Sequence, residues 1–222
     1  MPAYVFVSGA SLLIGLTVGT FFLPTVSPPS LAPPHTPLDV SRITRLTNTA
    51  LNLPISQTLR AEGGWTEWPA YSNMTPEERA GRLSSGAMGG SRGLGVQHIF
   101  WNEAERKSVQ VVWLGGALSG WPGVTHGGAI ATVMDEALGR VAARVLPAQT
   151  GVTANLSLTY RSPTPTGSFY VLRAEPVREE CGERKARVRA TLETVDGKVC
   201  VEAAALFVVP KGVQLEKIDD RY

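Results

Sequence analysis

The chain has 222 residues, 43% of them hydrophobic, which is enough for one folded domain with its own core and additional segments. Its formal net charge of +2 and pI near 8.6 are too mild to indicate a nucleic-acid-binding protein. Two cysteines, Cys181 and Cys200, exclude a disulfide scaffold, and we expect both to be free thiols in a reducing compartment.

The N-terminal 34 residues contain no Asp, Glu, Lys or Arg, and residues 4–23 form an apolar run long enough to span a bilayer as a helix. A single transmembrane anchor over residues 1–24 is the leading interpretation. A cleaved secretory signal and a mitochondrial transit peptide are the alternatives, but the basic residues typical of each are missing. Arg42 and Arg45 lie only on the C-terminal side of the run, which favours the cytosol or the matrix for the rest of the chain.

A proline-rich linker over residues 25–38 is expected next, because six prolines lie between residues 24 and 37. Residues 39–92 are predicted to be a helical lead-in followed by a loop. Asp39 is expected to cap a short helix over residues 40–51, which Pro54 ends.

The second half of this lead-in begins with a capping-box pattern. Thr75, Pro76 and Glu78 are an N-cap, a first-turn proline and a capping glutamate, which predicts a helix over residues 76–84. Residues 84–95 are rich in Gly and Ser and are predicted to be a mobile loop.

From Val96 the pattern becomes that of a single α+β domain over residues 93–212, with a tail at 213–222. We expect two strands, one long helix with an apolar stripe from Ile130 to Val145, and four further strands; the strands fall at 96–101, 108–114, 154–160, 169–174, 185–192 and 198–209. Asp196-Gly197 predicts a tight hairpin. A long helix against a curved antiparallel sheet is the hotdog arrangement, and its exposed sheet edges favour pairing of subunits.

The segment His126-Gly127-Gly128 at the start of this helix, with Asp135 two turns later, carries the chemistry. Free N–H groups at a helix start bind a carbonyl oxygen or a developing oxyanion, and a carboxylate on the same helix can activate water. A tight turn and a structural carboxylate are the alternative interpretations. Glu136 is expected outside the apolar stripe, in an exposed pair with Arg140.

These residues resemble the hotdog-fold acyl-coenzyme A thioesterases of the phenylacetate-pathway type. The likeness rests on His126-Gly127-Gly128 with Asp135 and on the segment from Thr153 to Pro163. It is closest to the mitochondrial thioesterase-superfamily subgroup, including the lead-in at 65–71 and 93–95, and it covers residues 60–210.

The resemblance implies roles for individual residues. Asp135 would be the general base or nucleophile, and Gly127 or Gly128 would present an N–H to the thioester oxygen. His126 would shape that loop or bond near the carbonyl, and Thr153 would orient the attacking water.

Further positions also follow from the resemblance. Arg161 would contact the phosphates of coenzyme A, and the site would form between two subunits, with the glycines and Asp135 from different chains. Gly120 stands where some relatives carry an asparagine. The family also implies a homodimer or tetramer and a mitochondrial location.

The remaining charged and metal-binding candidates have simpler interpretations. Arg184, Lys185, Arg187 and Arg189 are alternative phosphate contacts, but the last three alternate along a strand as a solvated basic face. His35 and His98 are expected to be structural or solvated, and no metal or redox cofactor is implied.

The leading hypothesis is therefore a membrane-anchored acyl-coenzyme A thioesterase. A non-catalytic acyl-binding or scaffold protein with the same fold is the second hypothesis, and a hotdog hydratase or dehydratase is the third. A serine-triad hydrolase is disfavoured because no Gly-x-Ser-x-Gly segment occurs.

Overall fold

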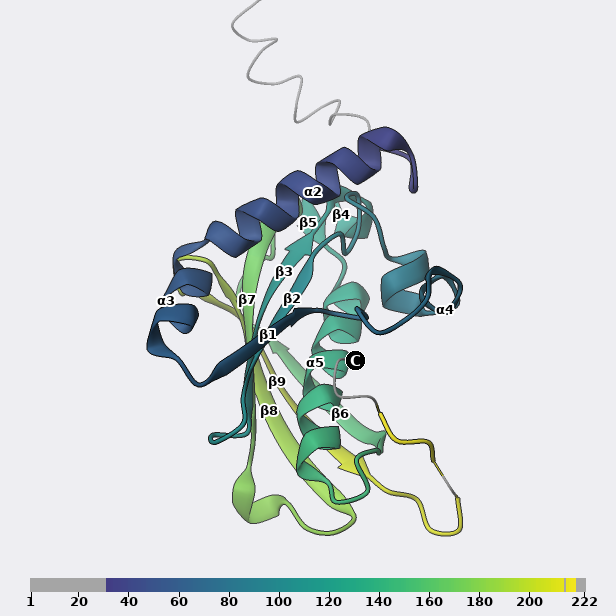
Figure 1. The fold of residues 1–222 in the computed structure, drawn as a ribbon, viewed down its shortest axis with the longest axis vertical. Coiled ribbons are helices and arrows are strands. Elements are labelled where there is room, and N and C mark those ends of the chain that lie inside the picture. Colours follow the sequence, from purple (N-terminus) through teal and green to yellow (C-terminus); the bar gives the residue numbers. More distant parts are fainter. Residues whose placement is uncertain (1–30, 214, 219–222) are drawn as a thin grey trace, which may run out of the picture. The chain divides into compact units, whose positions relative to one another are not determined.

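One long helix packs against one face of a seven-stranded antiparallel sheet with the order β1-β2-β3-β7-β8-β9-β6 (Figure 1). The helix is α5 (Gly127–Val145), and the strands are β1 (Trp65–Pro69), β2 (Gln97–Asn102), β3 (Lys107–Leu114), β6 (Val152–Tyr160), β7 (Ser168–Pro176), β8 (Lys185–Thr194) and β9 (Val199–Val208). This is the predicted hotdog architecture, with β1 added at one edge.

The computed structural model describes residues 31–213 and 215–218. The chain divides into two units, residues 1–31 and 32–222. The predicted transmembrane run at 4–23 lies outside the described residues. Among the helices of the described part, none combines the length and the apolar character that crossing a membrane requires.

The main core lies between α5 and the sheet. The predicted stripe of α5 is buried, with Met134, Leu138 and Val141 inaccessible to solvent. Alternate residues of β8 and β9, including Val188 and Ala205, meet it from the sheet. Burying each large apolar side chain stabilises the fold by about 1.5–3 kcal/mol, so this layer fixes where α5 lies on the sheet.

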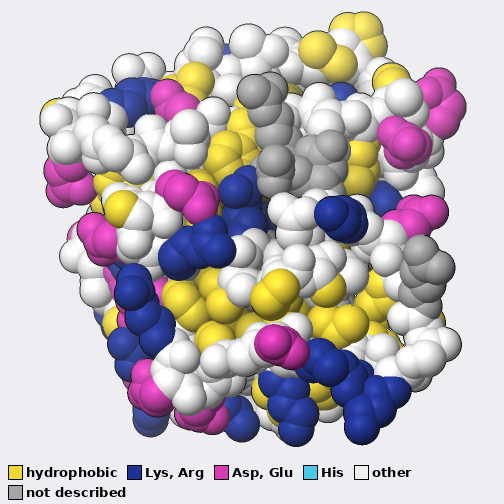
Figure 2. All heavy atoms as spheres, turned by 60° about the horizontal axis from the view of Figure 1, so that its bottom comes forward, with side chains coloured by type: hydrophobic (Ala, Val, Ile, Leu, Met, Phe, Trp, Pro, Cys, Tyr) yellow, Lys and Arg dark blue, Asp and Glu magenta, His cyan; other side chains and the backbone are white. Residues whose placement is uncertain are grey.

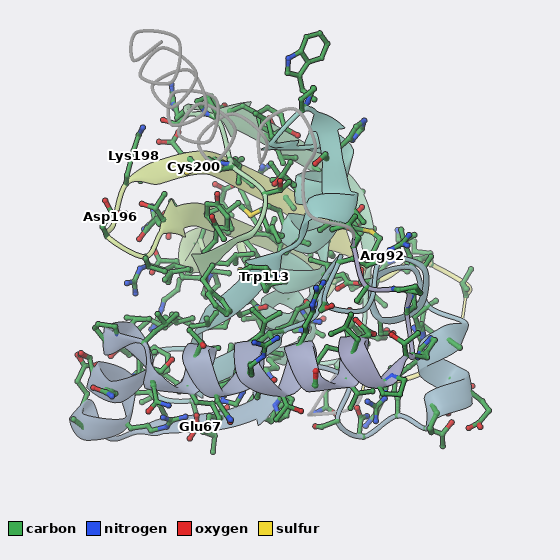
Figure 3. The ribbon with its side chains drawn as sticks, turned by 90° about the horizontal axis from the view of Figure 1, so that it is seen from above. Glu67, Arg92, Trp113, Asp196, Lys198 and Cys200 are labelled. Atoms are coloured by element: carbon green, nitrogen blue, oxygen red, sulfur yellow. The ribbon has the colours of Figure 1, made fainter. Side chains whose placement is uncertain are left out.

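A second layer of two helices covers part of the opposite sheet face. It consists of α2 (Pro37–Asn52) and α3 (Pro54–Glu62), and the side chains between it and the sheet, with Trp113 among them, are seen from above in Figure 3. Because β2 and β3 are covered on both faces, their residues are buried without alternation. The helix α3 and the strand β1 were not expected from the sequence.

The predicted cap of the first helix is wrong. The N-cap is Thr36, whose hydroxyl accepts a hydrogen bond from the N–H of Asp39, and the helix begins at Pro37 instead of residue 40. Asp39 is buried instead, and its carboxylate accepts bonds from the backbone N–H (2.8 Å) and hydroxyl (2.6 Å) of Ser91. These bonds attach the start of α2 to residue 91.

The loop predicted to be mobile is packed. The capping box at Thr75 is present, but α4 (Pro76–Ala80) is shorter than expected and a single π-helical turn (Leu83–Ala87) follows it. Ser84, Ser91 and Leu94 are buried. The glycines of this segment permit close backbone contacts; an added Cβ at Gly93 would come 2.0 Å from the carbonyl oxygen of Met88. Glycine content here therefore reflects tight packing.

The predicted hairpin between β8 and β9 is confirmed. Asp196 and Lys198 flank its turn (Figure 3), and Gly197 has φ of 91°, a left-handed conformation that glycine adopts without strain. Cys181 and Cys200 are free thiols, as expected.

Candidate active site

Three consecutive residues build the start of α5. His126 is the N-cap, and its Nδ1 accepts a hydrogen bond of 2.9 Å from the N–H of Gly128. Because Nδ1 accepts, a neutral ring carries its proton on Nε2, where it can donate to a ligand. Gly127 is the first helical residue, so its N–H has no acceptor within the helix. Of the two predicted glycines, Gly127 is therefore the better donor for a carbonyl oxygen.

Hydrogen bonds with neighbouring segments hold this helix start. The short hairpin of β4 (Ser119–Trp121) and β5 (Val124–Thr125) leads into it. The His126 N–H donates to the carbonyl of Leu118 at 2.8 Å, and the Tyr160 hydroxyl donates to the carbonyl of Gly127 at 2.8 Å. The Ile130 N–H donates to the His126 carbonyl at 3.1 Å, which holds the peptide that carries the Gly127 N–H.

Asp135 lies at the margin of the buried stripe, as predicted. Its Oδ1 accepts a hydrogen bond of 2.9 Å from the hydroxyl of Thr153 in β6. Burial raises the pKa of Asp135, the bond from Thr153 opposes this effect, and the charge of Glu136 adds to it. A carboxylate with a raised pKa is a stronger base, which suits it to take a proton from water.

A β-bulge explains how Thr153 reaches Asp135. Simple alternation places Thr153 on the face opposite Leu156. In the structure Thr153 pairs with Phe207 and Asn155 with Leu206, so Ala154 is an extra residue between them. The extra residue reverses the alternation, and Thr153 faces α5 on the same side as Leu156.

Glu136 does not form the exposed pair that the sequence predicts. Its side chain is only 17% exposed and that of Arg140 only 5%, and the two lie 3.5 Å apart. The Tyr71 hydroxyl donates a hydrogen bond to the same carboxylate oxygen. Glu136 is therefore committed to internal contacts, which leaves Asp135 as the carboxylate placed for chemistry.

Arg161 lies near the helix start but not beside Asp135. Its guanidinium bonds the Glu202 carboxylate at 2.7 Å, and both side chains are about half exposed. The residue also lines a hollow of about 350 Å³ with Gly127 and Tyr160. Its predicted role as a phosphate contact stays a prediction.

The predicted basic face carries ion pairs instead of isolated cations. Arg189 bonds Glu175 at 2.8 Å, and Arg187 pairs with Glu180. On the face shown in Figure 2, Lys and Arg side chains likewise lie among acidic ones. These neighbouring carboxylates weaken the case for phosphate contacts there.

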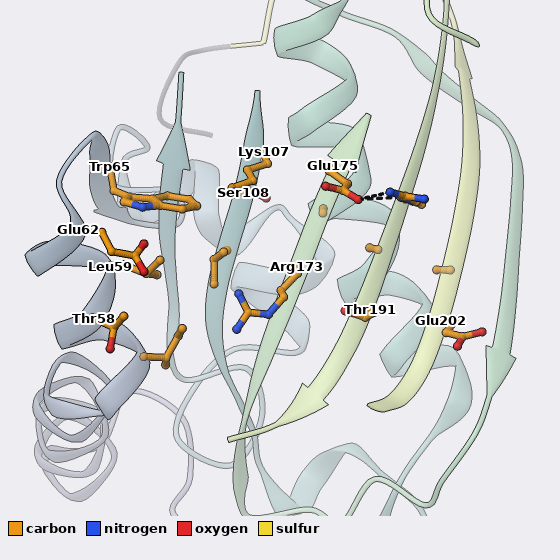
Figure 4. A pocket seen from close by; sticks show the side chains of 16 residues that line it. Thr58, Leu59, Glu62, Trp65, Lys107, Ser108, Arg173, Glu175, Thr191 and Glu202 are labelled. Carbon is orange, nitrogen blue, oxygen red and sulfur yellow. Dashed lines mark hydrogen bonds and ion pairs between the residues drawn. The ribbon is translucent and has the colours of Figure 1, made fainter. Parts of the chain in front are cut away.

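A larger hollow, of about 830 Å³, lies on the sheet face away from α5 (Figure 4). It runs between α3 and the outer faces of β3, β7, β8 and β9, with Trp65, Arg173 and Glu202 among its lining residues. Of the residues predicted to contact substrate, only Arg189, an alternative phosphate contact, lines it. The other predicted site residues lie around α5, where an N–H without an acceptor in the helix and a half-buried carboxylate occur.

The histidines outside α5 take structural positions. His98 is buried and its Nε2 contacts the Glu67 carboxylate at 2.8 Å, while His35 precedes α2 with φ of 62°. In the part of the chain that the structure describes, no group of three His, Cys, Asp or Glu side chains is arranged to hold a metal ion.

Two tyrosines with contacts at the site were not singled out from the sequence. Tyr160 orients Gly127, and the strand alternation that places it on the helix-facing side is the signal that points to it. Tyr71 contacts Glu136 from the segment after β1, and no local pattern indicates a contact across 65 residues.

Residues 122–201 match the model of the thioesterase superfamily. The acyl-coenzyme A thioesterase THEM4 of Rattus norvegicus is 30% identical over 166 residues, which is 66% of this chain and 70% of that protein. THEM4 of Mus musculus is 34% identical over 139 residues, 62% of this chain and 58% of that protein.

A mitochondrial relative and a solved structure are also similar. The uncharacterized mitochondrial membrane protein FMP10 of Saccharomyces cerevisiae is 28% identical over 171 residues, 74% of this chain and 66% of that protein. A crystal structure of a thioesterase superfamily protein is 22% identical with a TM-score of 0.46, covering 80% of this chain and 82% of that one.

Proposed function

Because this chain belongs to the thioesterase (hotdog) superfamily, we propose that it hydrolyses acyl-coenzyme A thioesters to a free acid and coenzyme A. The observation that carries the proposal is the combination on α5 of the oriented Gly127 N–H with the Asp135 carboxylate held by Thr153. The two groups supply what the reaction needs, polarisation of a carbonyl and activation of water.

The active site takes these groups from two subunits. Gly127 and Asp135 are eight residues apart, which is about 12 Å along a helix. One thioester cannot touch both, since each group must lie within about 3 Å of a reacting atom or its water. Asp135 of the partner subunit therefore acts on the carbonyl bound at Gly127. The strand β6 is an unpaired sheet edge and carries Thr153, so pairing of two β6 edges is the assembly we favour.

In the reaction, the thioester carbonyl oxygen accepts a hydrogen bond from the Gly127 N–H. Asp135 of the partner subunit takes a proton from a water oriented by the neighbouring threonine hydroxyl, and the water oxygen bonds to the carbonyl carbon. The tetrahedral intermediate then breaks its C–S bond, and the leaving thiolate takes up the proton that Asp135 received. His126 holds the loop and offers its Nε2 proton near the oxyanion.

We also propose a location. The apolar run at 4–23 would anchor the chain in a membrane, and similarity to FMP10, which is named a mitochondrial membrane protein, favours mitochondria. Carbonate extraction of isolated mitochondria tests this. A tagged full chain that stays in the pellet supports the anchor, and one released into the supernatant contradicts it.

Thiol release from acyl-coenzyme A esters of increasing chain length tests the activity. The full chain in detergent should release thiol, and Asp135→Asn should lower kcat by orders of magnitude. Asp196→Asn, in the exposed β8–β9 turn, is the matched control and should keep full activity. Ester binding without release by the folded protein would instead support a non-catalytic acyl-binding protein.

A further inference from the structure

A buried polar cluster adjoins Asp135 on the side away from β6. It consists of Glu136, Arg140, Tyr71 and Gln110, and Arg140, Tyr71 and Gln110 are all buried. Burying charged side chains costs free energy that hydrophobic residues of similar size would not. Such a cluster therefore suggests a role besides stability.

The contacts of the cluster are specific. Arg140 lies 3.5 Å from the Glu136 carboxylate, donates to Gln110 of β3 at 3.4 Å, and places its guanidinium 5.4 Å from the centre of the Tyr71 ring. The Tyr71 hydroxyl donates to Glu136. Glu136 thus accepts a hydrogen bond from Tyr71 and forms an ion pair with Arg140, and these two residues come from different parts of the fold.

Tyr71 brings the opposite end of the sheet into this cluster. It follows β1, which is the edge strand farthest from β6 in the sheet order. Its backbone has φ of 60° and is held by a bond from the N–H of Met74 at 3.1 Å. The strained turn thus presents the Tyr71 hydroxyl to α5 from the β1 side.

We propose that Glu136 is a positioning residue for Asp135, a role that rests on the function proposed above. Consecutive residues on a helix project about 100° apart, so fixing the direction of Glu136 fixes that of Asp135. Tyr71 and Arg140 hold Glu136 toward the β1 side, and Asp135 then faces Thr153 on the β6 side. Contacts from both edges of the sheet therefore act on adjacent residues of this turn of α5.

Glu136 also acts on Asp135 through its charge. The groups that act on Asp135 are the Thr153 hydroxyl from β6 and the Glu136 carboxylate from α5 itself, and the negative charge of Glu136 raises the pKa of Asp135. The groups facing Glu136 are Arg140 from α5 and Tyr71 from the β1–α4 connection. The cluster therefore keeps the negative charge of Glu136 beside Asp135 and holds that charge in one position.

The test compares Glu136→Gln with Glu136→Asp in the full chain. Glutamine still accepts from Tyr71 but removes the charge, so the acid limb of the kcat/KM profile should move to lower pH. Aspartate keeps the charge and should keep the limb of the wild type. Tyr71→Phe should lower kcat several-fold more than it raises KM. The control is Glu175→Gln, which removes an ion pair with Arg189 on the outer sheet face and should change none of these.

A direct titration separates this role from the proposed activity. Carbon-13 NMR of the Asp135 carboxyl, assigned with Asp135→Asn, should show a lower pKa in Glu136→Gln whether or not the protein turns over thioesters. If the Asp135 titration and the acid limb of Glu136→Gln both match those of the wild type, the role of Glu136 is overturned. If the wild type shows no Asp135-dependent turnover but Glu136→Gln still shifts the titration of Asp135, only the proposed function is overturned.

Discussion

Gly120 lies directly against His126: an added Cβ would come 2.6 Å from ring atom Cδ2 and 2.9 Å from the Cα. Real Cβ atoms do not approach so closely, so any side chain at position 120 must displace the residue that caps α5. Glycine at position 120 therefore lets this strand pass directly against the capping residue.

We predict that Gly120→Ala lowers kcat by at least tenfold, because moving His126 redirects the Gly127 N–H. Circular dichroism and kcat for acyl-coenzyme A hydrolysis measure the effect. Gly182→Ala is the control, since no atom lies within 4 Å of an added Cβ there. Equal activity in the two variants would show that the His126 ring can shift without consequence.

Substitutions at Gly127 test its N–H directly. Proline is favoured at the first position of a helix, and the extended backbone of His126 suits a following proline, so Gly127→Pro should fold while removing the N–H. We expect kcat to fall by about 10²–10³. Gly127→Ala keeps the N–H and adds a Cβ 3.1 Å from the Tyr160 hydroxyl, a tight contact that should cost much less. Similar losses in both variants would assign the effect to crowding.

Mixing two inactive variants tests the two-subunit site. In a mixed dimer of Asp135→Asn and Gly127→Pro, one site has both groups intact and the other has neither. Random mixing gives half mixed dimers, so about a quarter of the wild-type activity should return. Native mass spectrometry verifies the exchange of subunits. If the subunits exchange but the mixture stays inactive, the Gly127 N–H and the Asp135 carboxylate of one site come from the same chain.

Local patterns account for what the sequence predicts correctly. The apolar stripe of α5, the capping box at Thr75 and the Asp196-Gly197 hairpin each depend on residues a few positions apart, and all three are present. The positions of His126 and Asp135 along α5 also follow from this local pattern, while their roles stay predictions. These parts of the fold and of the site could be read from the residues.

Long-range contacts account for the differences. The direction of Thr153 depends on one extra residue in β6, and nothing in an alternating pattern marks a bulge. Glu136 and Arg140 look exposed on a helical wheel because the wheel omits the segment after β1 that covers them. The packing of Asp39 on Ser91 likewise joins residues 52 positions apart.

The bond from Thr153 makes a prediction about pH. It lowers the pKa of Asp135 against the rise that burial causes, so Thr153→Val should raise that pKa further and move the acid limb of kcat/KM to higher pH. Thr153→Ser keeps the hydroxyl and should retain the wild-type limb. A rate profile of both variants between pH 4 and 8 measures the shift. A valine variant with an unmoved limb would mean that the hydroxyl does not act on Asp135.

Asp135 should also limit the stability of the fold. Its pKa is raised by burial from an ordinary value of 3.8, so the folded protein holds this proton more tightly than the unfolded chain does. Ionised Asp135 therefore destabilises the fold: the penalty is absent below pH 3.8, grows as pH rises, and is complete above the folded-state pKa. Asp135→Asn keeps an oxygen for Thr153 without the charge, so its Tm should exceed that of the wild type at pH 7.

Thermal unfolding of a second variant provides a control in which Tm changes in the opposite direction. A hydrogen bond from Thr194 lowers the pKa of Asp196, so that ionised carboxyl favours the fold above pH 3.8 and loses its effect as pH falls. Asp196→Asn should therefore lower Tm at pH 7. The Asp135→Asn difference should shrink as pH falls toward 4, whereas the Asp196→Asn difference should persist there and shrink only below pH 3.8. If Asp135→Asn melted below the wild type at pH 7, the carboxylate would be a stabilising structural group. Greater stability together with lost turnover is instead the pattern expected where a site keeps a charge that folding alone disfavours.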